Sequence, residues 1–358
     1  MKKKWLFIMV FISFVVVLFF VSSANDNPSG LYISTEVCPE NYIQFAEENL
    51  PHFILAEDPT VELGAVSVGI PFSFYGGGSD VFYFPVMVDG IIEYLFRAYP
   101  GENGLCGAIT RFLAEELEEL ASLTSLETPL KLCLIGSQIV GIVNNQEYVL
   151  YTYPQHLQLS ASVVSSLRSP VEYTVVNSKQ ESGLQLNFVQ SRDVYRYLYL
   201  DITETQGSNN WCAAYVTAAI VRTLTGDSVS AQGVMETFYR RPTSSDSLSR
   251  TNVIAYGQLK GFSPILIGDT VNQTFITEIE NGRPVYWSMK RAIPGTDQHG
   301  YHAVVLCGYN FVYGSTWRIW NPWYDYYESF TMDGVYVPAT ASSTNYSYSY
   351  NAAIYNWQ

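Results

Sequence analysis

The sequence predicts an α+β protein in two parts, of which the second has a helical half followed by an antiparallel β half. The first observation is size, because 358 residues that are 48% hydrophobic can bury more than one core. The second is charge, because residues 25–190 hold 20 acidic and 5 basic residues whereas residues 191–358 hold 13 and 11. The third is periodicity, which indicates strands and hairpins early in the chain, and helices followed by strands late in the chain.

The first 24 residues are typical of a cleaved export signal. Three lysines, Lys2–Lys4, precede the apolar run Trp5–Val21, and the small residues Ser22–Ala24 follow it. A retained membrane anchor is the alternative, since the apolar run is almost long enough to span a bilayer. We expect export to the extracellular space, with no stable membrane anchor once the signal has been removed.

Residues 25–190 are expected to form a small α+β domain. Asp89-Gly90 lies between two β-rich runs and predicts a hairpin turn, while Pro85 favours an edge strand or a bulge. The segment AITRFLAEELEELASL predicts a helix over residues 108–123, with one apolar face and one glutamate-rich face. The expected strands are residues 65–68, 81–88, 91–96, 130–143 and 148–153, with a turn at Asn144-Asn145 between the last two. No convincing catalytic set occurs in this part.

Residues 155–195 are polar, rich in serine and weakly periodic. They are typical of an exposed connector, where proteolytic cleavage concentrates. Arg168, Lys179 and Arg192 are the candidate cut points.

Residues 191–358 are expected to begin with helices over 212–224 and 231–239, the first of which is stopped by Gly226. Strands are expected over residues 285–289, 302–309, 316–320 and 352–357. The acidic chain has no basic patch, which argues against a nucleic-acid partner.

Cys212 stands where the first of these helices should begin. Ser208, Asn209 or Asn210 could cap that helix. A thiol at a helix N-terminus feels the positive end of the dipole, which is expected to lower its pKa and favour the nucleophilic thiolate. The five cysteines form no CxxC pair, so a structural zinc site is not expected.

A cysteine nucleophile needs a base, a group that orients the base, and donors for the oxyanion. Of four histidines, His302 is the candidate base because it opens the alternating strand HAVVLCGY. Asn321 follows 19 residues later, the reach of a hairpin, and could orient the imidazole, while Trp323 could cover their hydrogen bond. Gln206 could donate to the oxyanion together with the backbone N–H of Cys212.

The order Gln, Cys, His, Asn is the constellation of papain-like thiol proteases. The segments ETQGSNNWCAAY, GYHAVVLCGYN and IWNPW together resemble the staphopain family of secreted bacterial papain-like cysteine peptidases. The resemblance covers roughly residues 190–358. The gap of 90 residues from Cys212 to His302 fits a compact bacterial branch of that fold.

This resemblance implies a papain-like catalytic domain over residues 191–358, preceded by a half-barrel-like prosegment over residues 25–190 and a signal peptide over residues 1–24. It implies that Cys212 is the nucleophile, His302 the general base and acid, Asn321 the residue that orients His302, and Gln206 part of the oxyanion hole. Trp211 and Trp323 also match the family pattern and would support the site.

The resemblance further implies that the partners are protein or peptide substrates, the protein's own prosegment as inhibitor, and in some members a small dedicated protein inhibitor. It implies no cofactor and no metal. His299, three residues before His302, could suggest a two-histidine metal site, but no nearby carboxylate pair supports one. Cys307 is expected to be a core thiol facing away from His302, and Cys38, Cys106 and Cys133 are available to pair within the prosegment.

Two other functions stay open at this point. One is a papain-fold amidase or acyltransferase, for example one that hydrolyses cell-wall amides. The other is a non-catalytic exported binding protein that has kept the papain fold.

Overall fold

The computed structural model describes residues 30–58, 60–75, 80–101, 104–135, 138–152, 172–186, 195–269, 272–292, 299–311, 315–332, 336–338 and 347–358. We call residues 30–186 the N-terminal region and residues 195–358 the C-terminal region, in each case for the described part. The expected signal peptide, His156, Arg168 and Arg192 lie outside the described residues. Within them, no helix combines the length and the apolar character that a membrane crossing requires.

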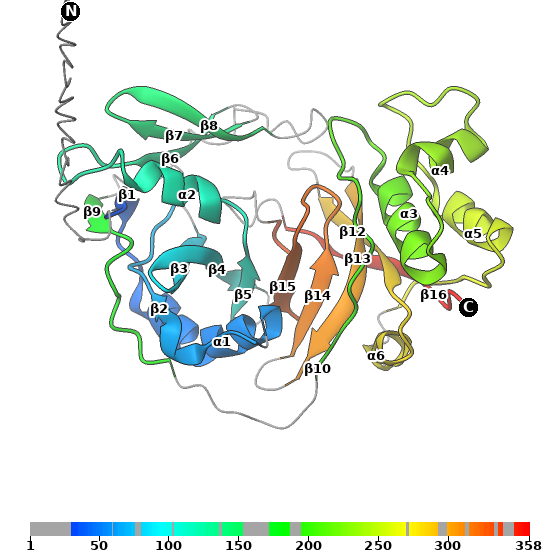
Figure 1. Ribbon diagram of the computed structural model, residues 1–358, viewed down its shortest axis with the longest axis horizontal. Coiled ribbons are helices and arrows are strands. Elements are labelled where there is room, and N and C mark those ends of the chain that lie inside the picture. Colours follow the sequence, from blue (N-terminus) through cyan, green and yellow to red (C-terminus); the bar gives the residue numbers. More distant parts are fainter. Residues whose placement is uncertain are drawn as a thin grey trace, which may run out of the picture.

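The α+β class is confirmed by a large antiparallel sheet and six α-helices in the described part of the chain (Figure 1). The helices are α1 (Glu40–Glu57), α2 (Ala114–Ala121), α3 (Cys212–Thr225), α4 (Ala231–Phe238), α5 (Arg250–Leu259) and α6 (Asn272–Glu280). The strands of the N-terminal region are β1 (Tyr32–Glu36), β2 (Val66–Val68), β3 (Phe82–Val88), β4 (Ile91–Gly101), β5 (Gly104–Thr110), β6 (Lys131–Ile135), β7 (Gln138–Val143), β8 (Gln146–Thr152) and β9 (Tyr173–Asn177). Those of the C-terminal region are β10 (Tyr195–Tyr197), β11 (Ile265–Ile267), β12 (Val285–Ala292), β13 (His299–Asn310), β14 (Thr316–Trp320), β15 (Tyr327–Thr331) and β16 (Ser349–Tyr355).

Helix α3 forms where the sequence predicts it, and its small and branched side chains explain its burial. Every residue from Ala213 to Arg222 is buried. Its apolar residues share a core with residues of β12 and β13, including Tyr286 and Val305. Gly226 ends the helix in the left-handed conformation with φ 74°, as expected for a C-terminal glycine.

Helices α4 and α5 cover α3 on the side away from the N-terminal region (Figure 1). Each has a serine N-cap, because Ser230 accepts from the N–H of Gly233 and Ser249 accepts from the N–H of Asn252. The sequence pattern predicts α4 but misses α1, α5 and α6, whose apolar positions are less regular.

The predicted hairpin turns are confirmed. Asp89 and Gly90 have φ values of 52° and 78°, and Asn144 and Asn145 have φ values of 49° and 62°. Positive φ at both central positions is the geometry that these residue types tolerate. Of the two alternatives for Pro85, the structure favours a bulge, since β3 is paired on both sides and its register with β4 shifts just after Val86.

The prediction of a helix over residues 108–123 is wrong in its first part. Ala108 and Ile109 belong to β5, which pairs with β4 on one side and with β15 on the other. Helix α2 begins only at Ala114, after Leu113 at φ 64°. The pairing with two neighbouring strands outweighs the local helical pattern.

The prediction that residues 155–195 form a plain exposed connector is also wrong in part. Residues 173–177 are β9, which pairs along its full length with β1 of the N-terminal region. Lys179 is not an exposed cut point, because its side chain is buried against Glu118 in an ion pair. Residues 173–179 therefore belong to the fold of the N-terminal region.

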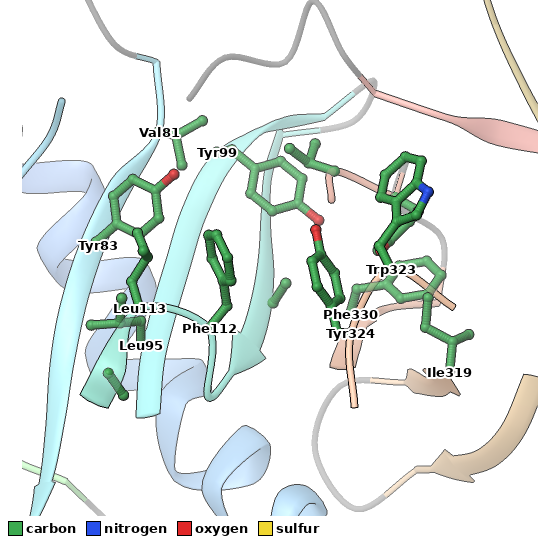
Figure 2. Packing of buried hydrophobic residues seen from close by; sticks show 14 of the residues in the cluster. Val81, Tyr83, Leu95, Tyr99, Phe112, Leu113, Ile319, Trp323, Tyr324 and Phe330 are labelled. Carbon is green, nitrogen blue, oxygen red and sulfur yellow. The ribbon is translucent and has the colours of Figure 1, made fainter. Parts of the chain in front are cut away.

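The two regions share one sheet and one core. Eleven strands form the large sheet in the described residues, with the order β11-β16-β12-β13-β14-β15-β5-β4-β3-β2 and β10 beside β13. The junction is β5 against β15, where Ala108 faces Phe330. Figure 2 shows the core running from Tyr83 and Tyr99 of the N-terminal region to Tyr324 and Trp323 of the C-terminal region.

None of the five cysteines is in a disulfide bond, so the pairing considered for Cys38, Cys106 and Cys133 does not occur. Cys307 is fully buried and packs in the core of α3, as expected.

Candidate active site

Cys212 is the first residue of α3, and its side chain is half-buried. The N-cap position is occupied by Trp211, with no side-chain capping bond, so the expected cap by Ser208, Asn209 or Asn210 is not formed. The side chain of Asn209 instead accepts a hydrogen bond from the N–H of Trp211 at 3.1 Å. The turn before the helix is thus held by its own local contacts.

Burial raises the pKa of the Cys212 thiol, although backbone hydrogen bonds from Ala303, Ala213 and Cys212 itself act in the opposite direction. The expectation of a lowered pKa is therefore not met. Desolvation penalises the charged form more than the helix N-terminus favours it. A thiolate at this position consequently depends on a neighbouring group that takes its proton.

His302 and Asn321 are brought together by the antiparallel pairing of β13 with β14, in which Val305 faces Trp320. Nε2 of His302 lies 2.9 Å from Oδ1 of Asn321. Both side chains are buried, at 3% and 0% exposure.

The orientation of the Asn321 amide is fixed by a second donor. Its Oδ1 also accepts from the backbone N–H of Trp323 at 3.1 Å, and an amide N–H can only donate. The oxygen therefore faces His302, and Nε2 of His302 must be the donor in their hydrogen bond. This leaves Nδ1 of His302 as the ring nitrogen that can exchange a proton with a reacting group.

Trp323 covers this pair. Its ring stacks on the His302 ring with centroids 4.0 Å apart and an interplanar angle of 24°. The Tyr348 ring lies 5.8 Å from the same imidazole. Trp323 is only 7% exposed, so it keeps water from the His302–Asn321 hydrogen bond.

Cys212 and His302 line the same open cavity of about 420 Å³. Its walls come from the start of α3, the segment before α5, and strands β12 and β13. The other lining residues are Asn210, Ala213, Ser247, Leu248, Ser249, Arg250, Tyr286, Ser288, Tyr301 and Ala303. The thiol and the imidazole are thus both accessible to a bound molecule.

Gln206 lies next to this arrangement but does not line the cavity. Its backbone N–H donates to the carbonyl of Pro322 at 2.6 Å, which fastens it to the loop after Asn321. Its side-chain Nε2 donates to the carbonyl of Asn209 at 2.5 Å. The amide is therefore held within the turn before Cys212, and its Oε1 is buried without a hydrogen-bond partner among the described residues.

Trp211 acts as an anchor for the same turn. Its indole N–H donates to the carbonyl of Thr243 at 2.9 Å, and its ring packs against the α3 core. His52 lies buried in α1 and His299 lies exposed at the start of β13, and neither lines the cavity. Throughout the described part of the chain, no three His, Cys, Asp or Glu residues gather in a way that could hold a metal ion.

The sequence reasoning missed the residues behind Asn321. Its Nδ2 donates to the hydroxyl of Tyr336 at 2.6 Å, and this hydroxyl donates to the carboxylate of Glu328. Glu328 in turn pairs with Arg97 of the N-terminal region at 3.4 Å. No local pattern signals this contact, because Arg97 and Glu328 are 231 residues apart.

The C-terminal region matches a known protein family, and most of the chain matches members of that family. Residues 190–357 match the family model described as Staphopain peptidase C47. The chain is 22% identical to Staphopain A of Staphylococcus aureus over 292 residues, which covers 73% of each chain. It is 23% identical to Staphopain B of the same species over 276 residues, which covers 67% of each chain. A solved C39-like peptidase from Bacillus anthracis is 12% identical, with a TM-score of 0.29 over 46% of this chain and 98% of that one.

Proposed function

Because residues 190–357 belong to the staphopain peptidase family, we propose that the chain is a secreted cysteine endopeptidase that is made as an inactive precursor. In this proposal residues 1–24 are a cleaved signal peptide, residues 25–190 are an inhibitory and folding prosegment, and residues 191–358 are the papain-like peptidase domain. The substrates are proteins or peptides, and the reaction uses no cofactor.

Cys212 is the proposed nucleophile and His302 the proposed general base. His302 accepts the Cys212 proton at Nδ1, and the thiolate attacks the scissile carbonyl carbon to form a tetrahedral oxyanion. His302 then donates that proton to the leaving amine, and a thioester remains on Cys212. Water activated by His302 hydrolyses the thioester and restores the thiol.

The other residues support these steps. Asn321 holds the imidazole through Nε2 and stabilises the imidazolium that forms, while Trp323 excludes water from that hydrogen bond. The backbone N–H of Cys212 and the side-chain amide of Gln206 are the proposed oxyanion donors. Trp211 holds the turn that carries Gln206 and Cys212 against the helix.

The observation that carries the proposal is the hydrogen bond of 2.9 Å between His302 Nε2 and Asn321 Oδ1, beneath the Trp323 ring. It sets the imidazole tautomer and leaves Nδ1 for proton exchange, and His302 lines a cavity that Cys212 also lines. A non-catalytic binding protein has no use for an oriented imidazole in a cavity that also holds a thiol.

The folding role of the N-terminal region is supported by its close attachment, whereas its inhibitory role follows from the family resemblance, since the residues that line the cavity belong to the C-terminal region. The N-terminal region continues the catalytic sheet through β5 and shares a core with the loop that carries Trp323. The family resemblance implies a small dedicated inhibitor protein as a further partner in some members.

The test is to incubate the exported chain with casein under mild reducing conditions, with and without an epoxysuccinyl peptide inhibitor. Intact mass is recorded over time. Wild type should digest casein and lose its N-terminal segment, and the inhibitor should add its mass to Cys212. Cys212→Ala should stay whole and inactive, whereas the matched control Cys307→Ala, which removes a thiol buried in the same core, should behave as wild type.

A chain that carries no inhibitor on Cys212 and cleaves nothing, even after limited proteolysis of the N-terminal region, contradicts the peptidase proposal. Hydrolysis or transfer restricted to cell-wall amides would favour the amidase or acyltransferase alternative. Full activity of the uncut chain, with an inactive 191–358 fragment, would contradict the precursor role alone.

A further inference from the structure

Four buried side chains form a continuous polar chain from the N-terminal region to the proposed active site. Arg97, Glu328 and Asn321 are 0% exposed, and Tyr336 is 1% exposed. Arg97 comes from β4, which lies between β5 and β3 in the large sheet, and Glu328 comes from β15. Tyr336 lies in a short segment that pairs with Tyr348, whose ring lies beside His302. Such a costly set of buried polar groups has to be satisfied internally.

The direction of every hydrogen bond in the chain is determined by its two ends. Arg97 is always a cation, and it donates to Glu328 and to the carbonyl of Pro338, the latter at 2.6 Å. Glu328 beside this cation is an acceptor, so the hydroxyl of Tyr336 donates to it. Since that hydroxyl has a single proton, it must accept from Nδ2 of Asn321.

The contacts at the Asn321 end give the same orientation of the amide independently. The backbone N–H of Trp323 requires the oxygen of Asn321 on the His302 side, as shown above. The negative charge of Glu328 draws the Tyr336 proton toward itself, which makes the Tyr336 oxygen a better acceptor for Asn321. The amide is polarised in turn, so that Oδ1 of Asn321 becomes a stronger acceptor for the N–H of His302.

Few other groups near this chain change charge around neutral pH. The tyrosines around Glu328 are Tyr99, Tyr151, Tyr326 and Tyr336, and burial raises the pKa of each. Burial is the largest single influence on the pKa of Arg97 and lowers it, but the Glu328 carboxylate together with the neighbouring tyrosines Tyr83, Tyr99 and Tyr336 outweighs it, so the pKa is raised. His302 lines one cavity with Cys212 and lies beside the Tyr348 ring. The Arg291 guanidinium lies over that ring, and burial raises the pKa of Tyr348.

We propose that Glu328 and Tyr336 are positioning residues that strengthen Asn321 as the acceptor for His302, and that Arg97 of the N-terminal region fixes this chain while the precursor folds. This inference deepens the proposed function. It means that the precursor carries an assembled His302–Asn321 pair, so that the N-terminal region acts as a template for the site as well as an inhibitor.

The experiment titrates His302 directly in the full chain. Cys212→Ala is used as the background, so that neither self-cleavage nor the thiol interferes, and the histidines carry ¹⁵N. Imidazole ¹⁵N shifts are followed with pH by NMR, and His302 is assigned by comparison with His302→Gln. Tyr336→Phe and Glu328→Gln should each lower the pKa of His302 by about one unit, since the imidazolium loses part of its stabilisation.

The variant Arg97→Met should also lower the pKa of His302. Arg97→Lys should leave this pKa close to the parent value, because lysine keeps the positive charge. Arg318→Met is the matched control. It breaks another buried ion pair between the two regions, Arg318 with Glu57 at 3.4 Å. This pair is separate from the polar side chains that lead from Arg97 to Asn321. His302 should titrate in this control as in the parent, and the exposed His299 should not shift in any variant.

Unchanged titration of His302 in folded Tyr336→Phe, which removes one oxygen and keeps the ring, would overturn the proposal. So would an equal shift in Arg318→Met, since the effect would then be general loosening. The measurement needs no turnover. If the titration of His302 does not change, the peptidase proposal is unaffected. If the protein does not digest casein, the result of the titration is unaffected.

Discussion

Two buried arginine–glutamate pairs join the N-terminal and C-terminal regions, and they differ in what lies behind them. In one pair the N-terminal region supplies the cation, Arg97, to Glu328, and the polar chain continues to the proposed active site. In the other it supplies the anion, Glu57, to Arg318, which lies over the Tyr327 ring at 4.2 Å. Both pairs have the same separation of 3.4 Å.

The difference shows that burial and distance alone do not reveal what an ion pair does. Buried pairs are weak evidence for net stability, because desolvation offsets much of the attraction. The Glu57–Arg318 pair contacts the Ser329 hydroxyl and the Tyr327 ring. It is expected only to hold the two regions together. The Arg97 pair fixes the direction of hydrogen bonds that reach Asn321, and is expected to affect chemistry as well.

The largest expected effect is that of Arg97→Met on the intact chain. It leaves Glu328 buried without its cation, which should lower the free energy of unfolding by about 3–5 kcal/mol. Urea unfolding of the Cys212→Ala parent and of the double variant measures this. A loss below about 1 kcal/mol would show that Glu328 is compensated by other groups.

A smaller loss, about 2–3 kcal/mol, is expected for Arg318→Met. Burial raises the pKa of Glu57 despite the attraction of Arg318, so this carboxyl can take up a proton once the cation is gone. The same unfolding assay gives the value. A loss larger than that of Arg97→Met would reverse the ranking of the two pairs.

The smallest expected effect is a pH dependence confined to the Glu57 pair. Because the pKa of Glu57 is raised on folding, its contribution to stability is fully present below the unfolded value of about 4.3 and is lost as pH rises through the folded value. The difference in stability between the parent and Arg318→Met should therefore shrink on acidification toward that unfolded value. Unfolding curves at mildly acidic and neutral pH test this, and a difference that grows on acidification would contradict it.

Short-range features were predictable from the sequence because neighbouring residues determine them. The helix from Cys212, its stop at Gly226, and the turns at Asp89-Gly90 and Asn144-Asn145 follow from backbone preferences. The contact of His302 with Asn321 was also predictable, since a simple hairpin joins their strands.

Long-range features were not predictable, because the deciding partners are remote in sequence. Residues 108–110 look helical until β15 is placed beside them. The pKa of Cys212 depends on burial by strands that lie far along the chain, which outweighs the helix N-terminus. Arg97 directly follows the expected strand over residues 91–96 and has no local feature that marks it, and only the fold shows that it lies within β4 and is fully buried against Glu328.

The shared sheet means that, in the proposed precursor, cleavage of the peptide between the two regions and activation are separate events. Strand β15 has β14 on one edge and β5 on the other, and the core around Phe330 and Tyr324 closes over this junction. Cutting the peptide between the two regions removes none of these contacts, so the nicked halves should stay associated as a non-covalent complex. Activation would then be limited by dissociation or by further digestion of the released half, and would depend on dilution in a way that simple cleavage does not.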